Sequence, residues 1–289
     1  ANDLVRGGAK QVTGLSGPVR KMRVTLDDPV SYTFIAGDQE ASVNTWLGRR
    51  ISINSIGLIN CVHCNRVTKK SFNQGYCYPC FQRLAQCDTC IIKPEKCHFA
   101  EGTCREPEWG ETNCFVDHVV YLANTSGVKV GITRGTQVPT RWIDQGATQA
   151  RPIARVATRY QSGLLEILLA QHVADKTAWQ TMLKGNGSPI DLHEKQRSLA
   201  EICAEGIDQL QSTYGMQAIQ WLDDSSSVNI DYPVLEWPVK VSSHNLDKTP
   251  EIEGTLLGIK GQYLMFDTGV INIRKYGGYN LEVKVHDNA

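Results

Sequence analysis

The sequence predicts an α+β fold in which several units follow one another along 289 residues. Apolar residues alternate with a period of two near both ends, whereas helix-like apolar patterns lie between them. Nine of the ten cysteines fall between Cys61 and Cys114, where periodic signals are weak. We therefore expect five segments: a β-rich start at 1–60, a cysteine-rich insert at 61–117, an α/β module at 118–187, a helical connector at 188–222 and a β-rich end at 223–289.

The two β-rich ends are expected from alternating patterns that turn residues interrupt. Stretches 20–26 and 30–35 alternate and are split by a turn-like Asp-Asp-Pro, and 50–59 adds a strand that leads into the first cysteine. Residues 254–274 contain two or three strands separated by glycines. Neither end reads as a complete barrel, so packing of the two ends together is one arrangement open to them. No long internal repeat is evident.

The middle of the chain switches between strand and helix patterns. Stretches 119–122 and 128–132 flank a five-residue loop, as in a β-hairpin. Ser162 stands where a helix N-cap is expected, just before a run of leucines. The other expected elements are a helix at 139–145, a strand at 152–158, a helix at 162–175 and a long amphipathic helix at 192–213.

Composition and charge are those of an ordinary globular chain, with 41% hydrophobic and 21% charged residues. No apolar run approaches the roughly 18 residues of a membrane span, and the start lacks the apolar stretch of a signal peptide. We therefore expect a cytoplasmic protein without a membrane partner.

The net charge is zero, yet residues 1–189 carry 22 Lys and Arg against 15 Asp and Glu, and residues 190–289 carry 8 against 15. This asymmetry permits a basic working face, although solvated surface explains it equally well.

The first four cysteines form the pairs Cys61-Val-His-Cys64 and Cys77-Tyr-Pro-Cys80. Two such pairs can bring four thiolates around one tetrahedral Zn²⁺, because each pair forms a tight turn that presents two sulfurs to the ion. Disulfides are the alternative, which the length of the chain and its dense thiols disfavour. The sequence therefore predicts a zinc-ribbon-like insert.

A second group of cysteines begins with Cys87-Asp-Thr-Cys90. We expect Cys97 and Cys104 to complete a second zinc site with this pair, because they are nearest in sequence. Cys114 and His98 are alternatives, and His118 can also reach the pair. Both zinc ions would be structural, because closed thiolate sites leave no position open for a catalytic water.

Basic residues alternate with aromatic residues around these cysteines. Lys69 and Lys70 can hold phosphates while neighbouring rings stack on bases. Alternatively, these rings bind no bases and simply cover the small core around the zinc ion. The aromatic residues concerned are Phe72, Tyr76, Tyr78 and Phe81.

The segments Val120-Tyr-Leu122 and Lys129-Val-Gly131, followed by Arg141 and Glu166, resemble the core of the GIY-YIG nucleases. In this resemblance Tyr121 corresponds to the first tyrosine of that family, Gly131 to the glycine of its second motif, and Arg141 to its helix arginine. Glu166 stands for the glutamate that binds one divalent metal. The resemblance spans 118–183, where the expected order of hairpin, helix, strand and helix also matches. It implies catalytic roles for Tyr121, Arg141 and Glu166, with Mg²⁺, only if the chain is a nuclease.

Lys129 departs from that pattern, because it stands where the second tyrosine belongs. Strand alternation places Tyr121 and Lys129 on one face of the hairpin. A protonated lysine grips a phosphate but does not readily deprotonate water. We therefore expect Lys129, Arg134 and Arg141 to hold phosphates, together with Lys69 and Lys70.

The whole chain also resembles an uncharacterised bacterial family of unknown function, through segments such as Gly75-Tyr-Cys-Tyr-Pro-Cys80 and Arg141-Trp-Ile-Asp-Gln-Gly146. No activity is established for that family, so this resemblance implies none. We expect a zinc-containing protein that binds nucleic acid without cleaving it, with RNA or the ribosome preferred over DNA. A Mg²⁺-dependent endonuclease is the first alternative, and a protein–protein adaptor is the second.

Overall fold

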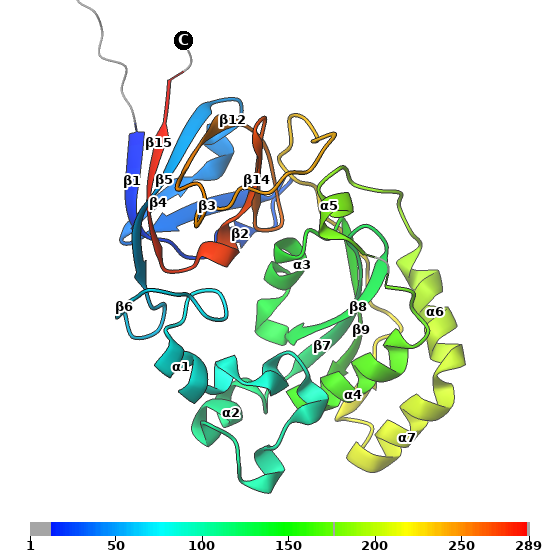
Figure 1. Ribbon diagram of the computed structural model, residues 1–289. Coiled ribbons are helices and arrows are strands. Elements are labelled where there is room, and N and C mark those ends of the chain that lie inside the picture. The colour runs from blue at the N-terminus through cyan, green and yellow to red at the C-terminus, as the bar shows by residue number, and fades with distance from the viewer. Residues whose placement is uncertain (1–12, 176, 288–289) are drawn as a thin grey trace, which may run out of the picture.

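The computed structural model describes residues 13–175 and 177–287 and has a mixed α+β architecture with three sheets (Figure 1). Two of the sheets come from the ends of the chain, and the third comes from its middle. The predicted α+β class is confirmed. In the described ranges, none of the helices combines the length and the apolar content that a membrane crossing requires.

The two ends of the chain form one unit, which we call the terminal unit. Its larger sheet has the order β1-β15-β5-β12-β13-β14, with β6 paired to β5, and its smaller sheet has the order β2-β3-β4. Apolar side chains from both sheets, such as Phe34, Ile53 and Ile252, pack in one core. The strands are β1 (Thr13–Pro18), β2 (Arg23–Thr25), β3 (Ser31–Ala36), β4 (Gln39–Ser42), β5 (Arg50–Asn60), β6 (Val67–Thr68), β12 (Glu251–Lys260), β13 (Tyr263–Phe266), β14 (Gly269–Asn272) and β15 (Tyr279–Val285).

The terminal unit contains a structural repeat that the sequence does not reveal. The series β1, β2, β3, β4, 3₁₀ helix, β5 recurs, without a counterpart of β2, as β12, β13, β14, 3₁₀ helix, β15. Strand β1 pairs with β15, β12 pairs with β5, and β5 pairs with β15, all antiparallel. Val43 and Ile273 begin the two 3₁₀ helices, and the residues ten positions later, Ile53 and Val283, lie opposite each other in the β5–β15 pair. The two copies are therefore related by an approximate twofold axis.

The middle of the chain forms the central unit, whose sheet has the order β10-β9-β7-β8, with β11 paired to β9. Val120 and Leu122 pack against the helices on one face, whereas Tyr121 and Ala123 belong to the core of the terminal unit on the other. The elements are β7 (His118–Asn124), β8 (Val128–Arg134), β9 (Gln149–Val156), β10 (Ile219–Trp221), β11 (Val228–Asn229), α3 (Thr140–Asp144), α4 (Arg159–Ala170), α5 (Trp179–Met182), α6 (Leu192–Ile202) and α7 (Ala204–Tyr214).

Three local expectations in this unit need correction. The hairpin loop has three residues rather than five, because pairing continues to Asn124 and Val128. Thr158, not Ser162, caps α4, where it forms a reciprocal capping box with Gln161. The expected long helix is two helices that meet at Cys203, which lets both present apolar side chains to the same sheet.

The cysteine-rich segment, residues 61–117, connects the two units and consists mainly of short turns (Figure 1). Its helices are α1 (Tyr78–Arg83) and α2 (Pro107–Asn113). Four 3₁₀ turns lie between them, at Ala85–Cys87, Thr89–Ile91, Pro94–Lys96 and Phe99–Glu101. Elements this short bury little apolar area, so another source of stability is needed.

Candidate metal centre and cationic cavity

The first four cysteines converge on one point. The sulfur atoms of Cys61, Cys64, Cys77 and Cys80 all lie within 4.8 Å of one another. Cys64 Sγ and Cys77 Sγ are 3.7 Å apart, which is close to the edge of about 3.8 Å in a tetrahedron with Zn–S bonds of about 2.3 Å. The ten cysteines all lie in the described ranges, and no disulfide joins any of them in this structure. These four cysteines can bind one metal ion.

Local backbone geometry builds this first cysteine cluster. Asn65 adopts a left-handed conformation with φ 58°, and its N–H donates to the Cys61 carbonyl at 2.9 Å, which closes the first turn. Cys77 is the N-cap of α1, so the second turn leads directly into a helix. Burial acts to raise the pKa of Cys61, but backbone N–H donors of Cys64, Cys77 and His63 lower it to about 6. Such donors stabilise the thiolate that a metal requires.

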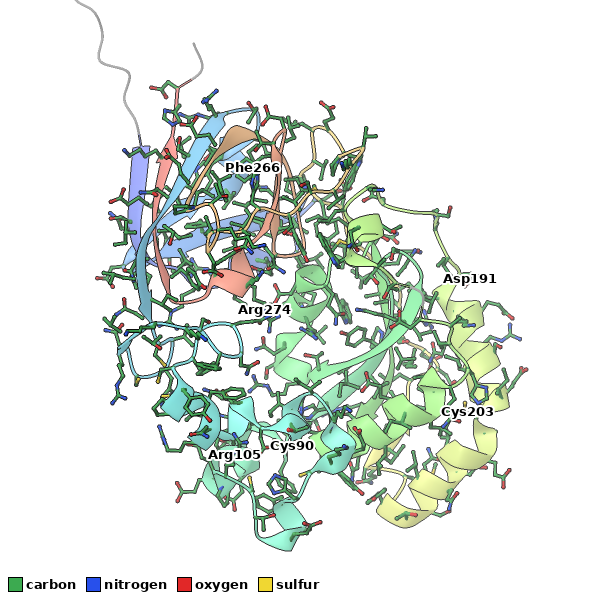
Figure 2. The ribbon with its side chains drawn as sticks, in the orientation of Figure 1. Cys90, Arg105, Asp191, Cys203, Phe266 and Arg274 are labelled. Atoms are coloured by element: carbon green, nitrogen blue, oxygen red, sulfur yellow. The ribbon has the colours of Figure 1, made fainter. Side chains whose placement is uncertain are left out.

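A cavity of about 840 Å³ lies where the terminal unit, the cysteine-rich segment and the central unit meet. Among the residues that the structure describes, seven basic side chains and two carboxylates line it, so this lining is strongly cationic. Arg274 reaches it from the 3₁₀ helix before β15 (Figure 2). The charged lining residues are Arg20, Lys21, Lys129, Arg134, Arg141, Arg159, Arg274, Glu166 and Asp175.

Four of these basic side chains have partners within the protein. Arg20 donates to the Val62 carbonyl at 2.8 Å, and Lys21 pairs with Asp144. Arg134 donates to Asn113, and Arg159 donates to the Ile91 carbonyl. Within 13–175 and 177–287, Lys21 is the one of the seven that pairs with a carboxylate, so Lys129, Arg141 and Arg274, like Arg20, Arg134 and Arg159, form no ion pair.

The predicted hairpin is confirmed, and it holds Tyr121 beside the cavity wall. Tyr121 lies opposite Gly131, so its ring shares a face with Lys129. The ring is fully buried against Gly131, does not line the cavity and lies 5.9 Å from the Trp142 ring. Burial raises the pKa of Tyr121 to about 12. Tyr121 therefore supports the wall rather than facing a ligand.

Gln145, which the sequence analysis did not identify, links Tyr121 to Arg141. With its amide oxygen turned toward Arg141, it accepts from Nε at 3.3 Å and from Nη2 at 3.2 Å. Its amide nitrogen then donates to the Tyr121 hydroxyl oxygen at 2.8 Å. The only available signal was its position four residues after Arg141, which places both side chains on one face of a helix.

Glu166 lines the same cavity from α4 and is partly buried. Burial raises the pKa of Glu166, while Arg159, Arg141 and Lys129 act to lower it. Burial also lowers the pKa of Lys129, and nearby Arg141 adds to that effect. The predicted residues Lys129, Arg134, Arg141 and Glu166 are thus brought together.

Lys69 and Lys70 are exposed and lie outside the cavity lining, so the structure does not place them with the other predicted phosphate ligands. Of the four aromatic residues beside them, Tyr76 and Phe81 pack against the first cysteine cluster. Phe72 stacks on Phe81 with ring centroids 5.6 Å apart, and Tyr76 alone of the four reaches the cavity. Sequence reasoning also missed four basic lining residues: Arg20, Lys21, Arg159 and Arg274.

The expected second set of cysteines is not brought together as predicted. Cys87 packs with Cys61, Cys77 and Cys80, and it does not line the cavity that Cys90 lines. Four other cysteines line a separate small cavity. These are Cys90, Cys97, Cys104 and Cys114.

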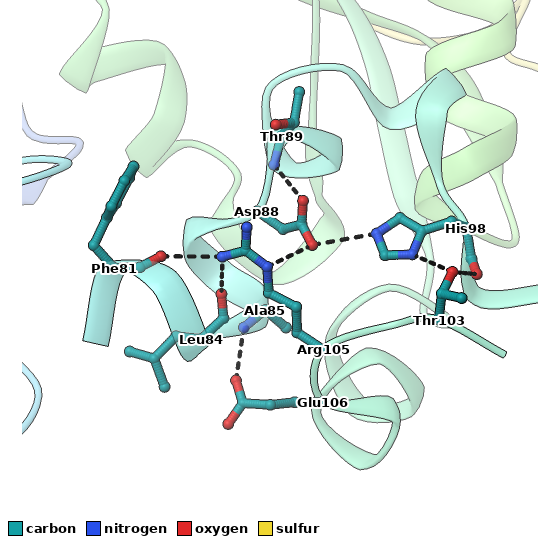
Figure 3. Close-up of polar contacts among 9 residues, drawn as sticks. All are labelled: Phe81, Leu84, Ala85, Asp88, Thr89, His98, Thr103, Arg105 and Glu106. Carbon is teal, nitrogen blue, oxygen red and sulfur yellow. Dashed lines mark hydrogen bonds and ion pairs between the residues drawn. The ribbon is translucent and has the colours of Figure 1, made fainter. Parts of the chain in front are cut away.

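His98, one of the alternative ligands, belongs to a polar network (Figure 3). Its Nδ1 lies 2.8 Å from Thr103 Oγ1 and its Nε2 lies 3.2 Å from Asp88 Oδ2. Asp88 also pairs with Arg105 Nε at 2.9 Å, and Arg105 donates to the Phe81 carbonyl at 3.0 Å. The network ties the loop that contains Cys97 and Cys104 to α1.

A family model described as "Protein of unknown function (DUF2797)" matches residues 48–281. The chain belongs to this family. No curated protein and no solved structure matches the chain.

The family match spans all cysteines and nearly all of the cavity. Of the charged lining residues, Arg20 and Lys21 alone lie outside it. In the terminal unit, the match includes β5 and β12 but begins after β4, so it leaves out most of the first structural copy. The cationic cavity is therefore mainly a feature of the matched range.

Proposed function

We propose that this protein binds the phosphate backbone of a nucleic acid in the cationic cavity, with RNA or a ribosomal particle preferred over DNA. The observation that carries the proposal is the convergence of Lys129, Arg141 and Arg274, which have no carboxylate partner in the described ranges, on one cavity. Unpaired cations that share a cavity repel one another, and a polyanion relieves this repulsion while releasing its own counterions.

The size of the cavity favours a single strand. Its volume of about 840 Å³ falls within the range of about 300–1,000 Å³ that is typical of ligand pockets. A duplex is far wider, since its major groove alone measures about 12 Å. Sequence-specific recognition of RNA is usually directed at unpaired loops and ends, which supports the preference for RNA. Tyr76 in the lining offers a ring on which a base can stack.

We further propose that 118–187 is a degenerate GIY-YIG-like module and that 61–117 is a zinc-ribbon-like insert. In this arrangement the module supplies Lys129 and Arg141, and zinc in the first cysteine cluster holds the tight turn between Phe72 and Tyr76, whose Asn73 and Gln74 line the cavity. Val62 and Tyr76 are adjacent to metal-binding cysteines and also line the cavity. The metal would thus fix one wall of the cavity and take no part in chemistry.

A Mg²⁺-dependent nuclease is the second candidate function. It is favoured by Glu166, a carboxylate that shares the cavity with Arg141. It is disfavoured by Lys129 in place of the second tyrosine and by the burial of Tyr121, which cannot reach a phosphate from its position behind Gly131. An adaptor that binds a protein is the third candidate.

The test is the salt dependence of binding to a fluorescein-labelled single-stranded RNA, measured by anisotropy. Three phosphate contacts predict a slope of about −2 in log K against log salt, and an affinity loss of about 20-fold between 50 and 200 mM salt. The double variant Lys129→Ala/Arg274→Ala should retain one contact, with a slope of about −0.7 and a loss of about threefold.

The matched control is Lys69→Ala/Lys70→Ala, which removes the same charge outside the cavity and should preserve the slope. Equal effects of the two double variants would show that the cavity is not the binding site. Absence of RNA and DNA affinity at low salt would favour the adaptor. Mg²⁺-dependent cleavage of RNA or branched DNA that Glu166→Gln abolishes would establish the nuclease.

A further inference from the structure

A second cavity in the cysteine-rich segment has the composition of a closed metal site. Four cysteines line it together with Phe99, Trp109 and Phe115, and its volume is about 20 Å³. A space of about 10–15 Å³ holds one water molecule, so this cavity has room for a single ion. The Phe99 and Phe115 rings lie 4.6 Å apart and make part of its lining apolar.

We propose that Cys90, Cys97, Cys104 and Cys114 bind a second structural zinc ion, and that Cys87 does not belong to this site. The four cysteines come from separate elements: a 3₁₀ turn, the end of the next turn, the loop before α2 and the C-cap of α2. A ligand set drawn from four short elements explains how a segment with little apolar core keeps one structure.

The assignment replaces Cys87 with Cys114, which the sequence offered only as an alternative partner of the Cys87–Cys90 pair. Cys87 is buried against the first cysteine cluster and is absent from the lining of the second cavity. Cys114 lies 24 residues after Cys90, yet the helix α2 returns it to the same cavity. Proximity in the fold, rather than in the sequence, therefore selects the fourth ligand.

A competing set consists of Asp88, Cys90 and His98, whose ligand atoms lie within 4.8 Å of one another. Both ring nitrogens of His98 already have hydrogen-bond partners. The Asp88 carboxylate already pairs with the Arg105 guanidinium and accepts a hydrogen bond from the Thr89 N–H. These contacts account for the proximity of the three residues without a metal (Figure 3). They orient the loops that contain three of the four proposed ligands.

The four sulfurs of the second cavity do not meet the 4.8 Å spacing of the first cluster, so metal binding requires them to approach. Each cysteine has a single side-chain rotation that moves its sulfur between staggered positions. Because the cavity lies between all four side chains, rotations of this kind can direct the sulfurs toward its centre. Zinc binding at this site thus needs side-chain rather than backbone rearrangement.

This site would also stabilise the wall of the cationic cavity that contains Arg159. Ile91 lines both cavities, and its carbonyl accepts from the Arg159 guanidinium. The backbone N–H of Arg159 donates to the Cys114 carbonyl at 2.8 Å. A metal at the second site therefore holds the segment that positions Arg159 in the cationic wall.

The experiment is native mass spectrometry of the full chain purified in zinc-containing buffer. The wild type should carry two zinc ions, and Cys114→Ser should carry one. Cys87→Ser and His98→Ala are the matched controls, and both should retain two. Loss of one zinc in Cys87→Ser with full retention in Cys114→Ser would overturn the assignment, as would a wild type with fewer than two zinc ions.

X-ray absorption at the zinc edge of the wild type keeps the test decisive if Cys114→Ser does not fold. Two all-thiolate sites predict an average of four sulfur neighbours at about 2.3 Å and no nitrogen or oxygen. A mixed shell with nitrogen and oxygen neighbours would instead identify the set that contains Asp88 and His98. Neither measurement depends on nucleic-acid binding, so the assignment of this metal site can be supported or refuted independently of the proposed function.

Discussion

Gly131 sits where the packing of Tyr121 against the hairpin is tightest, which makes Gly131→Ala a sharp perturbation of the candidate site. A Cβ at this position would lie 2.5 Å from Tyr121 Cζ and 2.7 Å from its hydroxyl oxygen. Separations under 3.0 Å are not tolerated, so the ring has to move. Tyr121 is fully buried with Trp142 beside it, so movement of its ring disturbs packed neighbours.

Overpacking of this kind costs about 1–3 kcal/mol of unfolding free energy. At about 2–4 °C per kcal/mol, the melting temperature should fall by about 2–12 °C in a thermal scan followed by circular dichroism. Displacement of Tyr121 also separates Gln145 from Arg141, so the salt dependence of RNA binding should weaken in the same variant.

Gly135→Ala is the matched control, because a Cβ there meets nothing closer than the Asp117 carbonyl oxygen at 3.5 Å. Tyr121→Leu should suppress part of the penalty of Gly131→Ala, which a double-mutant cycle measures as a coupling of about 0.5–3 kcal/mol. A melting temperature of Gly131→Ala equal to that of Gly135→Ala, or strict additivity with Tyr121→Leu, would refute this account of the site.

Two further predictions concern the metal and pH. Cys77→Ser or zinc chelation should expose residues 61–83 to rapid amide hydrogen exchange, because metal binding supplies the folding free energy of this segment; unchanged protection in the chelated protein would argue against a structural metal. Burial lowers the pKa of His118 to about 4, and its Nδ1 lies 2.6 Å from the Val116 carbonyl oxygen. The unfolded chain takes up this proton near pH 6.5 and the folded chain only near pH 4, so the free energy of unfolding should fall as pH drops through this window, by at most about 3 kcal/mol. Denaturant titrations of the wild type and His118→Asn at pH 7 and pH 4.5 measure the difference, and equal losses in both proteins would contradict it.

Features that depend on neighbours in the sequence were predictable. The hairpin at 118–134 follows from apolar alternation around a short loop, since strand faces repeat every two residues. The first cysteine cluster follows from two pairs with short spacing, since each tight turn presents its sulfurs with little help from the rest of the fold. Lys129 and Tyr121 share a face for the same local reason.

Features that depend on how distant segments pack were decided by the tertiary structure. The sequence places Cys87 beside Cys90, but packing turns Cys87 toward the first cluster and brings Cys114 to the second cavity. The twofold repeat of the terminal unit is not evident as a long repeat in the sequence, because many apolar residues can fill equivalent positions. Arg274 is the clearest case: it lies 133 residues from Arg141, and only the pairing of the two chain ends brings its charge into the same cavity. The sequence determined which charges and thiols were available, and long-range packing determined which of them meet, because the direction of a side chain is set by the surfaces that bury its neighbours.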